Sequence, residues 1–159
     1  MGHGLWVKGD KTMRKQYGVK QLSIFLENRM GRLLEVTQTL KDADVNIRAL
    51  AMAESAEFGI LRLVVNNPEK AKSVLSAGGF TVSEQDVFAV EVEDIPGSFC
   101  RVVEKLTKQD INIDYTYAFL GSAKKAVLLF RVPEDLLEKA MTALKEANVN
   151  LVEPLFFYD

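Results

Sequence analysis

The apolar positions of this chain change their spacing in a fixed order. Residues 22–27 (LSIFLE) alternate between the two sides of a strand, with Leu22, Ile24 and Leu26 on the apolar side. The apolar positions after residue 31 recur at helical spacing and predict a helix with one apolar face. The remaining elements predicted for this half are strands at 45–53 and 58–65, a helix at 68–77 and a final strand near 80–87.

The same order occurs a second time along the chain. Sliding the sequence by 66 positions places Gly31 on Gly97, and VNI at 45–47 on INI at 111–113. Apolar positions exchange like for like over 29 ungapped positions, which indicates a duplicated unit. The second copy is predicted to hold strands at 88–92, 111–119 and 126–132, a helix after Gly97, a helix at 133–147 and a last strand at 150–157.

This element order predicts an α+β fold made of two βαββαβ ferredoxin-like domains in tandem. Each domain is expected to be an antiparallel sheet with two helices on one face. We predict the first domain at 19–86, the second at 87–159, and a flexible N-terminal tail at 1–18, which is aperiodic and rich in Gly and Lys. The junction at 83–94 contains no Gly or Pro, so the last strand of domain one is expected to run directly into domain two.

Composition excludes several classes of protein. The chain has 159 residues, of which 48% are apolar and 26% charged, a balance typical of globular proteins. The net charge of −2 argues against a nucleic-acid surface, and no apolar run approaches the roughly 20 residues of a membrane span. The single cysteine, Cys100, excludes an internal disulfide and favours a cytoplasmic location.

The turn before the first helix has chemistry of its own. Gly31 can adopt a positive φ and leave the backbone open, and the helix behind it offers unpaired N–H groups. Together these features make a cradle for a carboxylate, to which the helix dipole contributes about 0.3–1 kcal/mol. Asn28 and Asn46 offer donors and acceptors that suit an amino acid. Two alternatives stay open, because such glycine turns often bind nothing and asparagines often cap helix C-termini.

The stretches ENRMGRLLEVTQTLKDADVNIRAL and DIPGSF followed by DINI resemble the ACT domain, a small-molecule regulatory module of amino-acid metabolism. Its pattern is a strand, N-x-P-G-x-L, a helix, and G-[VI]-N-I leading into the next strand. The resemblance implies an amino acid bound at the interface between paired ACT domains, touched by the glycine loop and by the VNI asparagine of the partner domain. The implied ligand-binding residues are Asn28, Met30, Gly31, Arg32, Leu33, Asn46, Asp94, Pro96, Gly97, Ser98, Phe99 and Asn112.

The first copy is similar to the regulatory domains of phosphoglycerate dehydrogenase and of the acetolactate synthase small subunit. Leu26 stands where the serine-sensing domains carry a histidine, and Met30 stands where the pattern has proline, so serine is not the expected ligand. Asp94 replaces Asn28 in the second copy, and it suits an ammonium group better than a carboxylate. The two loops are therefore expected to be unequal.

No catalytic set emerges from the sequence. The only histidine, His3, lies in the predicted tail, so Cys100 has no histidine partner and is interpreted as a buried or half-buried structural thiol. We expect no catalytic residue, no metal and no cofactor. Tyr115, Tyr117 and Phe119 alternate on one strand and could stack bases, but the third strand lacks the basic, aromatic stretch of RNA-binding modules. These rings are expected to pack on the sheet or to line a ligand pocket.

Two functions fit these features. The first is a non-catalytic amino-acid-binding sensor. The second is a regulatory subunit that acts in trans on an amino-acid biosynthetic enzyme, similar to the acetolactate synthase small subunit. Under both hypotheses we expect a homodimer, because exposed sheet edges in small domains are usually covered.

Overall fold

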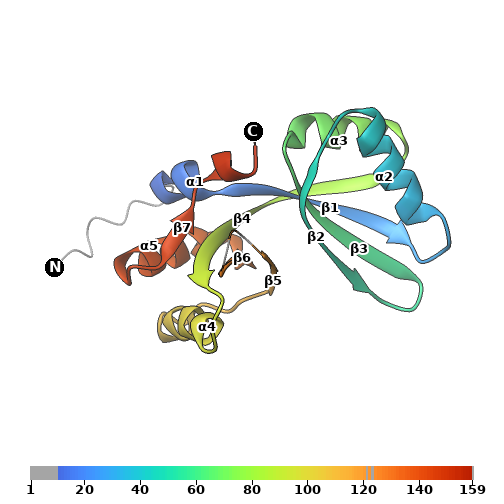
Figure 1. The fold of residues 1–159 in the computed structure, drawn as a ribbon. Coiled ribbons are helices and arrows are strands. Elements are labelled where there is room, and N and C mark those ends of the chain that lie inside the picture. The colour runs from blue at the N-terminus through green and yellow to red at the C-terminus, as the bar shows by residue number, and fades with distance from the viewer. Residues whose placement is uncertain (1–10, 121, 123, 159) are drawn as a thin grey trace. The chain divides into compact units, whose positions relative to one another are not determined.

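A computed structural model describes residues 11–120, 122 and 124–158, and Figure 1 shows its fold. The chain separates into two compact units. The first unit contains Val19–Asp86 and the C-terminal residues from Leu155 onward. The second unit contains Val87–Pro154 together with the described N-terminal residues 11–18.

The first unit is an antiparallel sheet with helices on one face. Its strands are β1 (Val19–Glu27), β2 (Ile47–Glu54), β3 (Phe58–Val65) and the first half of β4 (Thr81–Glu93), in the order β2-β3-β1-β4. The helices α2 (Arg32–Asp42) and α3 (Pro68–Ala77) lie on one face of this sheet (Figure 1). Leu22, Ile24 and Leu26 face the helices and are almost fully buried, as their alternation predicted.

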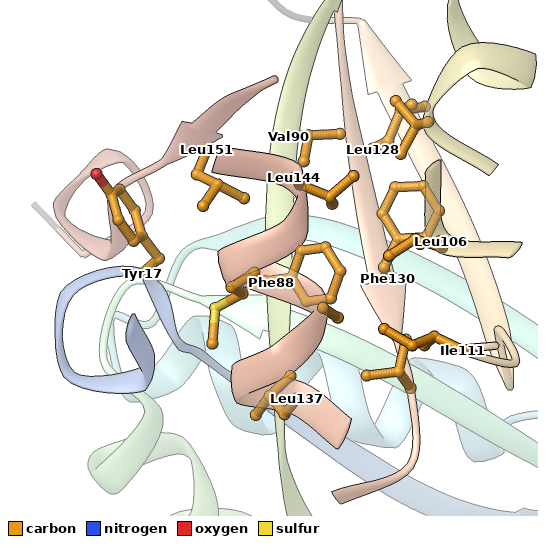
Figure 2. Close-up of a cluster of buried hydrophobic side chains, with 14 residues drawn as sticks. Tyr17, Phe88, Val90, Leu106, Ile111, Leu128, Phe130, Leu137, Leu144 and Leu151 are labelled. Atoms are coloured by element: carbon orange, nitrogen blue, oxygen red, sulfur yellow. The ribbon is translucent and has the colours of Figure 1, made fainter. Parts of the chain in front are cut away.

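The second unit repeats this arrangement. The second half of β4, β5 (Tyr115–Leu120), β6 (Lys125–Arg131) and β7 (Asn150–Val152) form a sheet in the order β7-β4-β6-β5, with α4 (Ser98–Lys108) and α5 (Leu137–Glu146) as its helices. Figure 2 shows its core, where Phe88 and Phe130 stack with ring centroids 5.5 Å apart. In both units the fourth strand lies beside the first, followed by the third and the second. The predicted pair of ferredoxin-like βαββαβ domains is confirmed.

The strand β4 is continuous from Thr81 to Glu93. The absence of Gly and Pro between residues 83 and 94 predicted this continuity, because neither a flexible residue nor a missing N–H interrupts the strand. The helix predicted at 133–147 is divided instead. It begins with one 3₁₀ turn, η2 (Glu134–Leu136), and continues as α5.

The four helices on the sheets end in the same way. In each case the second residue after the helix has a left-handed backbone. These residues are Asp44, Gly79, Asp110 and Asn148, with φ of 58°, 87°, 56° and 61°. The next N–H then reaches back to the last helical turn, as when Val45 donates to the Leu40 carbonyl over 2.9 Å. This bond satisfies a helix-terminal carbonyl and turns the chain toward the next strand.

Part of the predicted flexible tail is a helix. Residues Thr12–Tyr17 form α1, which packs on α5 of the second unit. The Glu138 carboxylate accepts the N–H groups of Met13 and Arg14, and so caps the N-terminus of α1. A periodicity argument cannot detect this helix, since its partner lies more than a hundred residues away. Residues 1–10, including His3, lie outside the described residues.

An ion pair also holds α1 to the second unit. The Arg14 guanidinium pairs with the Glu134 carboxylate, which Arg131 contacts at 3.0 Å. Burial by itself would raise the pKa of Glu134, but the hydrogen bonds from Arg14 and Arg131 outweigh it and hold that pKa below its ordinary value. The contribution of these ion pairs to the free energy of unfolding is therefore present above the ordinary carboxyl pKa. It is lost as the pH falls through the lowered pKa of Glu134.

The C-terminal segment departs from the prediction as well. The strand expected at 150–157 ends at Val152, because Pro154 has no N–H to donate and starts the 3₁₀ turn η3 (Pro154–Phe156). The segment then packs within the first unit. Arg48 donates to the Phe156 carbonyl over 3.1 Å, and the Lys20 N–H donates to the Tyr158 hydroxyl over 2.6 Å. Burial raises the pKa of Tyr158.

Among the described residues, no helix has the length and apolar character needed to cross a membrane.

The helix ends generate a stability prediction. Asp44→Gly should raise the free energy of unfolding by up to about 1 kcal/mol, because glycine adopts a positive φ without the steric cost of a side chain. Asp42→Gly is the matched control, since Asp42 is the last residue of α2 and glycine there should cost about 0.3 kcal/mol. Urea unfolding midpoints measure both. Shifts of the same sign would contradict the assignment of Asp44 as the left-handed residue.

Candidate functional site

The first glycine loop, residues 28–31, joins β1 to α2. Gly31 has φ 94° and precedes the first helical residue, so the predicted positive φ is confirmed. The Asn28 N–H donates to the Glu57 carbonyl over 2.8 Å, and the Glu35 N–H donates to the Gly31 carbonyl over 3.0 Å. The Asn28 side chain donates to the Ala56 carbonyl over 3.3 Å. These bonds fix the loop to the β2–β3 turn and to the helix.

The second glycine loop, residues 94–97, repeats this backbone at the same positions. Gly97 has φ 92°. The Asp94 N–H donates to the Lys124 carbonyl over 2.8 Å, and the Arg101 N–H donates to the Gly97 carbonyl over 3.0 Å. Within the described residues, the N–H groups of Gly97 and Phe99 are given no acceptor by the chain. Both loops therefore present a helix N-terminus with donors available to an anion.

The charges around the two loops differ. In the first loop, Arg32 pairs with Glu35 in the first turn of α2, and its guanidinium lies 4.5 Å from the centroid of the Phe80 ring. The Arg32 side chain is thus used for packing within the unit. In the second loop, Ser98 and Arg101 occupy the positions equivalent to Arg32 and Glu35, and α4 has no acidic residue in its first turn. The first turn of α4 therefore carries no carboxylate that would repel an anion, while the second loop itself carries the acidic Asp94.

Each loop borders a cavity in its own unit. The first, of about 230 Å³, is lined by five of the predicted residues, Asn28, Met30, Gly31, Arg32 and Leu33. The second, of about 410 Å³, is lined by three of them, Asp94, Ser98 and Phe99. Pro96 and Gly97 lie in the same loop but do not line this cavity.

The two strand asparagines lie elsewhere. Asn46 directly precedes β2 and exchanges hydrogen bonds with Asn66, at the end of the sheet where Ile47 pairs with Val65. The Gly31 loop is at the opposite end, and the 11-residue helix α2 runs between them, a length of about 16 Å. Asn112 donates to the Asp114 carboxylate over 3.2 Å, three residues before β5 begins. Neither asparagine meets the glycine loop of its own unit.

Several cavity residues were not among the predicted ones. Met52 and Gly59 line the first cavity, and Thr116, Tyr117, Ala118 and Ala126 line the second. Only Tyr117 had a signal in the sequence, as one of the alternating aromatic residues expected to pack or to line a pocket. Small residues such as Ala118 add nothing to the hydrophobic pattern from which elements are predicted. Aligning the two copies does place Ala118 at the position of Met52, which shows the difference in side-chain size.

The interpretation of Cys100 as a buried or half-buried thiol is wrong, because its side chain is exposed. The buried face of α4 carries Val102 and Leu106, and Cys100 lies about 200° around the helix from Val102. In the described part of the chain, no three His, Cys, Asp or Glu residues gather as a metal site would require.

A larger cavity of about 750 Å³ lies beside α3 in the first unit. Three of its polar residues are already used by the chain. Asn67 caps α3 by accepting the Lys70 N–H, Lys20 pairs with Asp86 at 2.7 Å, and the Tyr158 hydroxyl accepts the Lys20 N–H. Size alone therefore does not make this cavity a better binding site than the smaller ones beside the glycine loops.

Comparisons with known proteins agree with this geometry. Residues 17–155 match the family model described as an ACT domain pair. The solved structure of the protein BT0572 from Bacteroides thetaiotaomicron is 37% identical, and the match covers 91% of this chain and 98% of that one with a TM-score of 0.85.

More distant structures share the fold. The ligand-free regulatory subunit of aspartate kinase from Thermus thermophilus is 12% identical, and the match covers 82% of this chain and 93% of that one with a TM-score of 0.59. The corresponding subunit from Thermus flavus is 13% identical, with 83% and 94% covered and a TM-score of 0.60. No protein with a curated description matches. On the match along residues 17–155 and the 37% identity, this chain belongs to the ACT domain pair family and is built of two ACT domains in tandem.

Proposed function

We propose that this protein is a non-catalytic regulator that binds an amino acid at the second glycine loop. The observation that carries the proposal is the pairing of two opposite features beside one cavity. The N-terminus of α4 has free donors and no acidic residue in its first turn, and the Asp94 carboxylate lines the adjacent cavity. An amino acid carries the complementary pair, a carboxylate and an ammonium.

The two ends of the ligand have distinct partners. The carboxylate accepts from backbone N–H groups at the start of α4, where the helix dipole adds about 0.3–1 kcal/mol. The ammonium pairs with Asp94, which is exposed and therefore available. In the first loop the corresponding charges cancel, since Arg32 and Glu35 pair with each other and Asn28 is neutral. We infer that the second loop is the primary site.

The strand asparagines require a second ACT domain. Because Asn46 and Asn112 lie far from the loops of their own units, they can contribute to a ligand site only where another ACT domain approaches. The ligand position between paired ACT domains remains part of this proposal, as does a cytoplasmic location, which rests on the single cysteine.

A homodimer forms the next part of the proposal. The edge strand β2 exposes Leu50 and Met52, with 59% and 50% of their surfaces accessible. Two copies of β2 pairing antiparallel about Ala51 would place Leu50 opposite Met52, and Glu54 opposite Arg48. This self-complementary order suits a two-fold contact and would cover an apolar edge.

A second candidate function is regulation of a biosynthetic enzyme in trans. It is favoured by the length of the two aspartate kinase regulatory subunits, of which the matches cover 93% and 94%. Tagged protein expressed in its own host, purified with and without added amino acids, should then retain an enzyme of amino-acid synthesis, identified by mass spectrometry. Recovery of the chain alone under both conditions would reject this candidate.

The binding site generates a matched pair of variants. An added Cβ meets nothing within 4 Å at either Gly31 or Gly97, and the two φ angles are 94° and 92°. Gly31→Ala and Gly97→Ala should therefore lose similar stability, about 1–2 kcal/mol. Only Gly97→Ala should weaken amino-acid binding, by at least about tenfold.

Calorimetric titration with each of the twenty amino acids measures this binding, and thermal unfolding checks that the two variants are equally stable. No heat with any amino acid at millimolar concentration would overturn the proposed function. Loss of binding in Gly31→Ala alone would move the site to the first loop.

The dimer edge generates a further prediction. Leu50→Lys should convert the dimer to a monomer, because it places a charge at the centre of the apolar edge, and light scattering reports the mass. Thr116→Lys is the control at the equivalent position of β5, the other edge strand, and it should remain dimeric. A dimeric Leu50→Lys variant together with a monomeric Thr116→Lys variant would assign the contact to β5. A monomeric mass for the unsubstituted protein would refute the dimer.

A further inference from the structure

The cavities beside the two glycine loops occupy equivalent places, and one pair of residues distinguishes them. Met52 of β2 lies opposite Leu61 of β3, and Ala118 of β5 lies opposite Leu128 of β6. All four face the helices, since Leu61 and Leu128 belong to the cores of their units. The strand pairing therefore makes Ala118 the counterpart of Met52.

The floors of the cavities correspond in the same way. Leu26 of β1 pairs with Gly59, and Val92 of β4 pairs with Ala126. In the first unit, the Met52 methyl group lies 3.2 Å from the place where a Cβ on Gly59 would be. Met52 thus lays an unbranched apolar side chain along the floor. In the second unit Ala118 ends at its Cβ, and the cavity measures about 410 Å³ against about 230 Å³.

On this comparison we propose that the second cavity holds the apolar side chain of the amino-acid ligand, and that Met52 fills the equivalent space in the first unit and closes it to ligand. This inference rests on the proposed function, because the carboxylate and ammonium of the ligand must be held at the Gly97 loop. The inference adds that the ligand is an amino acid with an apolar side chain. It also explains why the second ACT domain binds the ligand and the first does not.

The lining of the second cavity supports an apolar side chain. Val92, Ile95 and Leu128 line it, and the Phe99 ring is held in place by stacking on Phe130, with centroids 6.0 Å apart and planes 10° apart. The Thr116 hydroxyl already donates to the Leu129 carbonyl over 2.7 Å, so its hydrogen is not available to a ligand. Apart from the hydroxyl groups of Ser98 and Tyr117, the cavity therefore offers contacts mainly to carbon atoms.

The charged groups near this cavity lie at its loop end. Among the described lining residues there is no Lys, Arg or His, and the two carboxylates are Glu93 and Asp94. Glu93 pairs in register with Lys125 and alternates to the opposite side of β4 from Val92. Asp94 is assigned to the ammonium group. An acidic side chain would meet only like charge here, whereas each methylene buried against carbon improves affinity about fourfold.

The test is a calorimetric titration of the full chain with methionine, leucine, phenylalanine, alanine, serine, aspartate and lysine. At least one of the three large apolar amino acids should bind at least about tenfold more tightly than alanine, aspartate or lysine. Ala118→Met, which copies the first unit, should weaken that binding at least about tenfold. Ala118→Leu fills the same space with a different shape and repeats the test if the methionine variant is unstable.

Ala77→Met, which adds the same side chain at the exposed end of α3, is the matched control and should leave the affinity of the second cavity unchanged. Tightest binding of aspartate, serine or lysine, or unchanged affinity in a folded Ala118 variant, would overturn this inference and leave the proposed function standing. Absence of binding by every amino acid would reject the proposed function and this inference together.

Discussion

Each unit of this protein depends on one constraint: a single apolar sheet face must be covered by two helices within about seventy residues. The chain must therefore reverse at the end of every element, with almost no room for a loop. It does so with residues of positive φ, glycine at 31 and 97 before helices and aspartate at 44 and 110 after them. The first kind of reversal leaves helix N–H groups uncovered, so the feature that allows compact folding also creates a place for an anion.

Duplication has kept this backbone and changed its surroundings. The hydrogen bonds of the two glycine loops match to within 0.1 Å at equivalent positions, for instance 3.4 Å and 3.3 Å for the bonds from Arg32 to Arg29 and from Ser98 to Ile95. The side chains around them have diverged, most clearly at Met52 and Ala118. Because the loop geometry is shared, a functional difference between the copies must come from these neighbouring side chains.

Much of the fold follows from the sequence because its determinants are local. Alternation in β1, helical spacing in α2 and the glycine before each helix act over a few residues and repeat in the second copy. Two of the errors concern contacts between distant residues, whereas the end of the last strand at Val152 has a local cause in Pro154. Helix α1 depends on Glu138, and the C-terminal turn on Arg48 and Lys20, and no pattern within residues 12–17 or 150–158 carries that information. The loops were predictable for the same reason as the helices, whereas the cavity walls formed by Ala118 and Ala126 were not.

The terminal segments also show that boundaries of the repeat and boundaries of packing differ. Tyr17 lies in the predicted tail yet is buried in the core of the second unit, and Phe157 lies in the predicted second domain yet is fully buried and belongs to the first unit. A cut between residues 86 and 87 would therefore separate the repeats but remove a buried aromatic ring from each. Loss of a buried phenylalanine typically costs about 3–5 kcal/mol, a large share of the stability of a domain this small. Each ACT domain therefore depends on a terminal segment that lies outside its own repeat in the sequence, although each buries a core of its own.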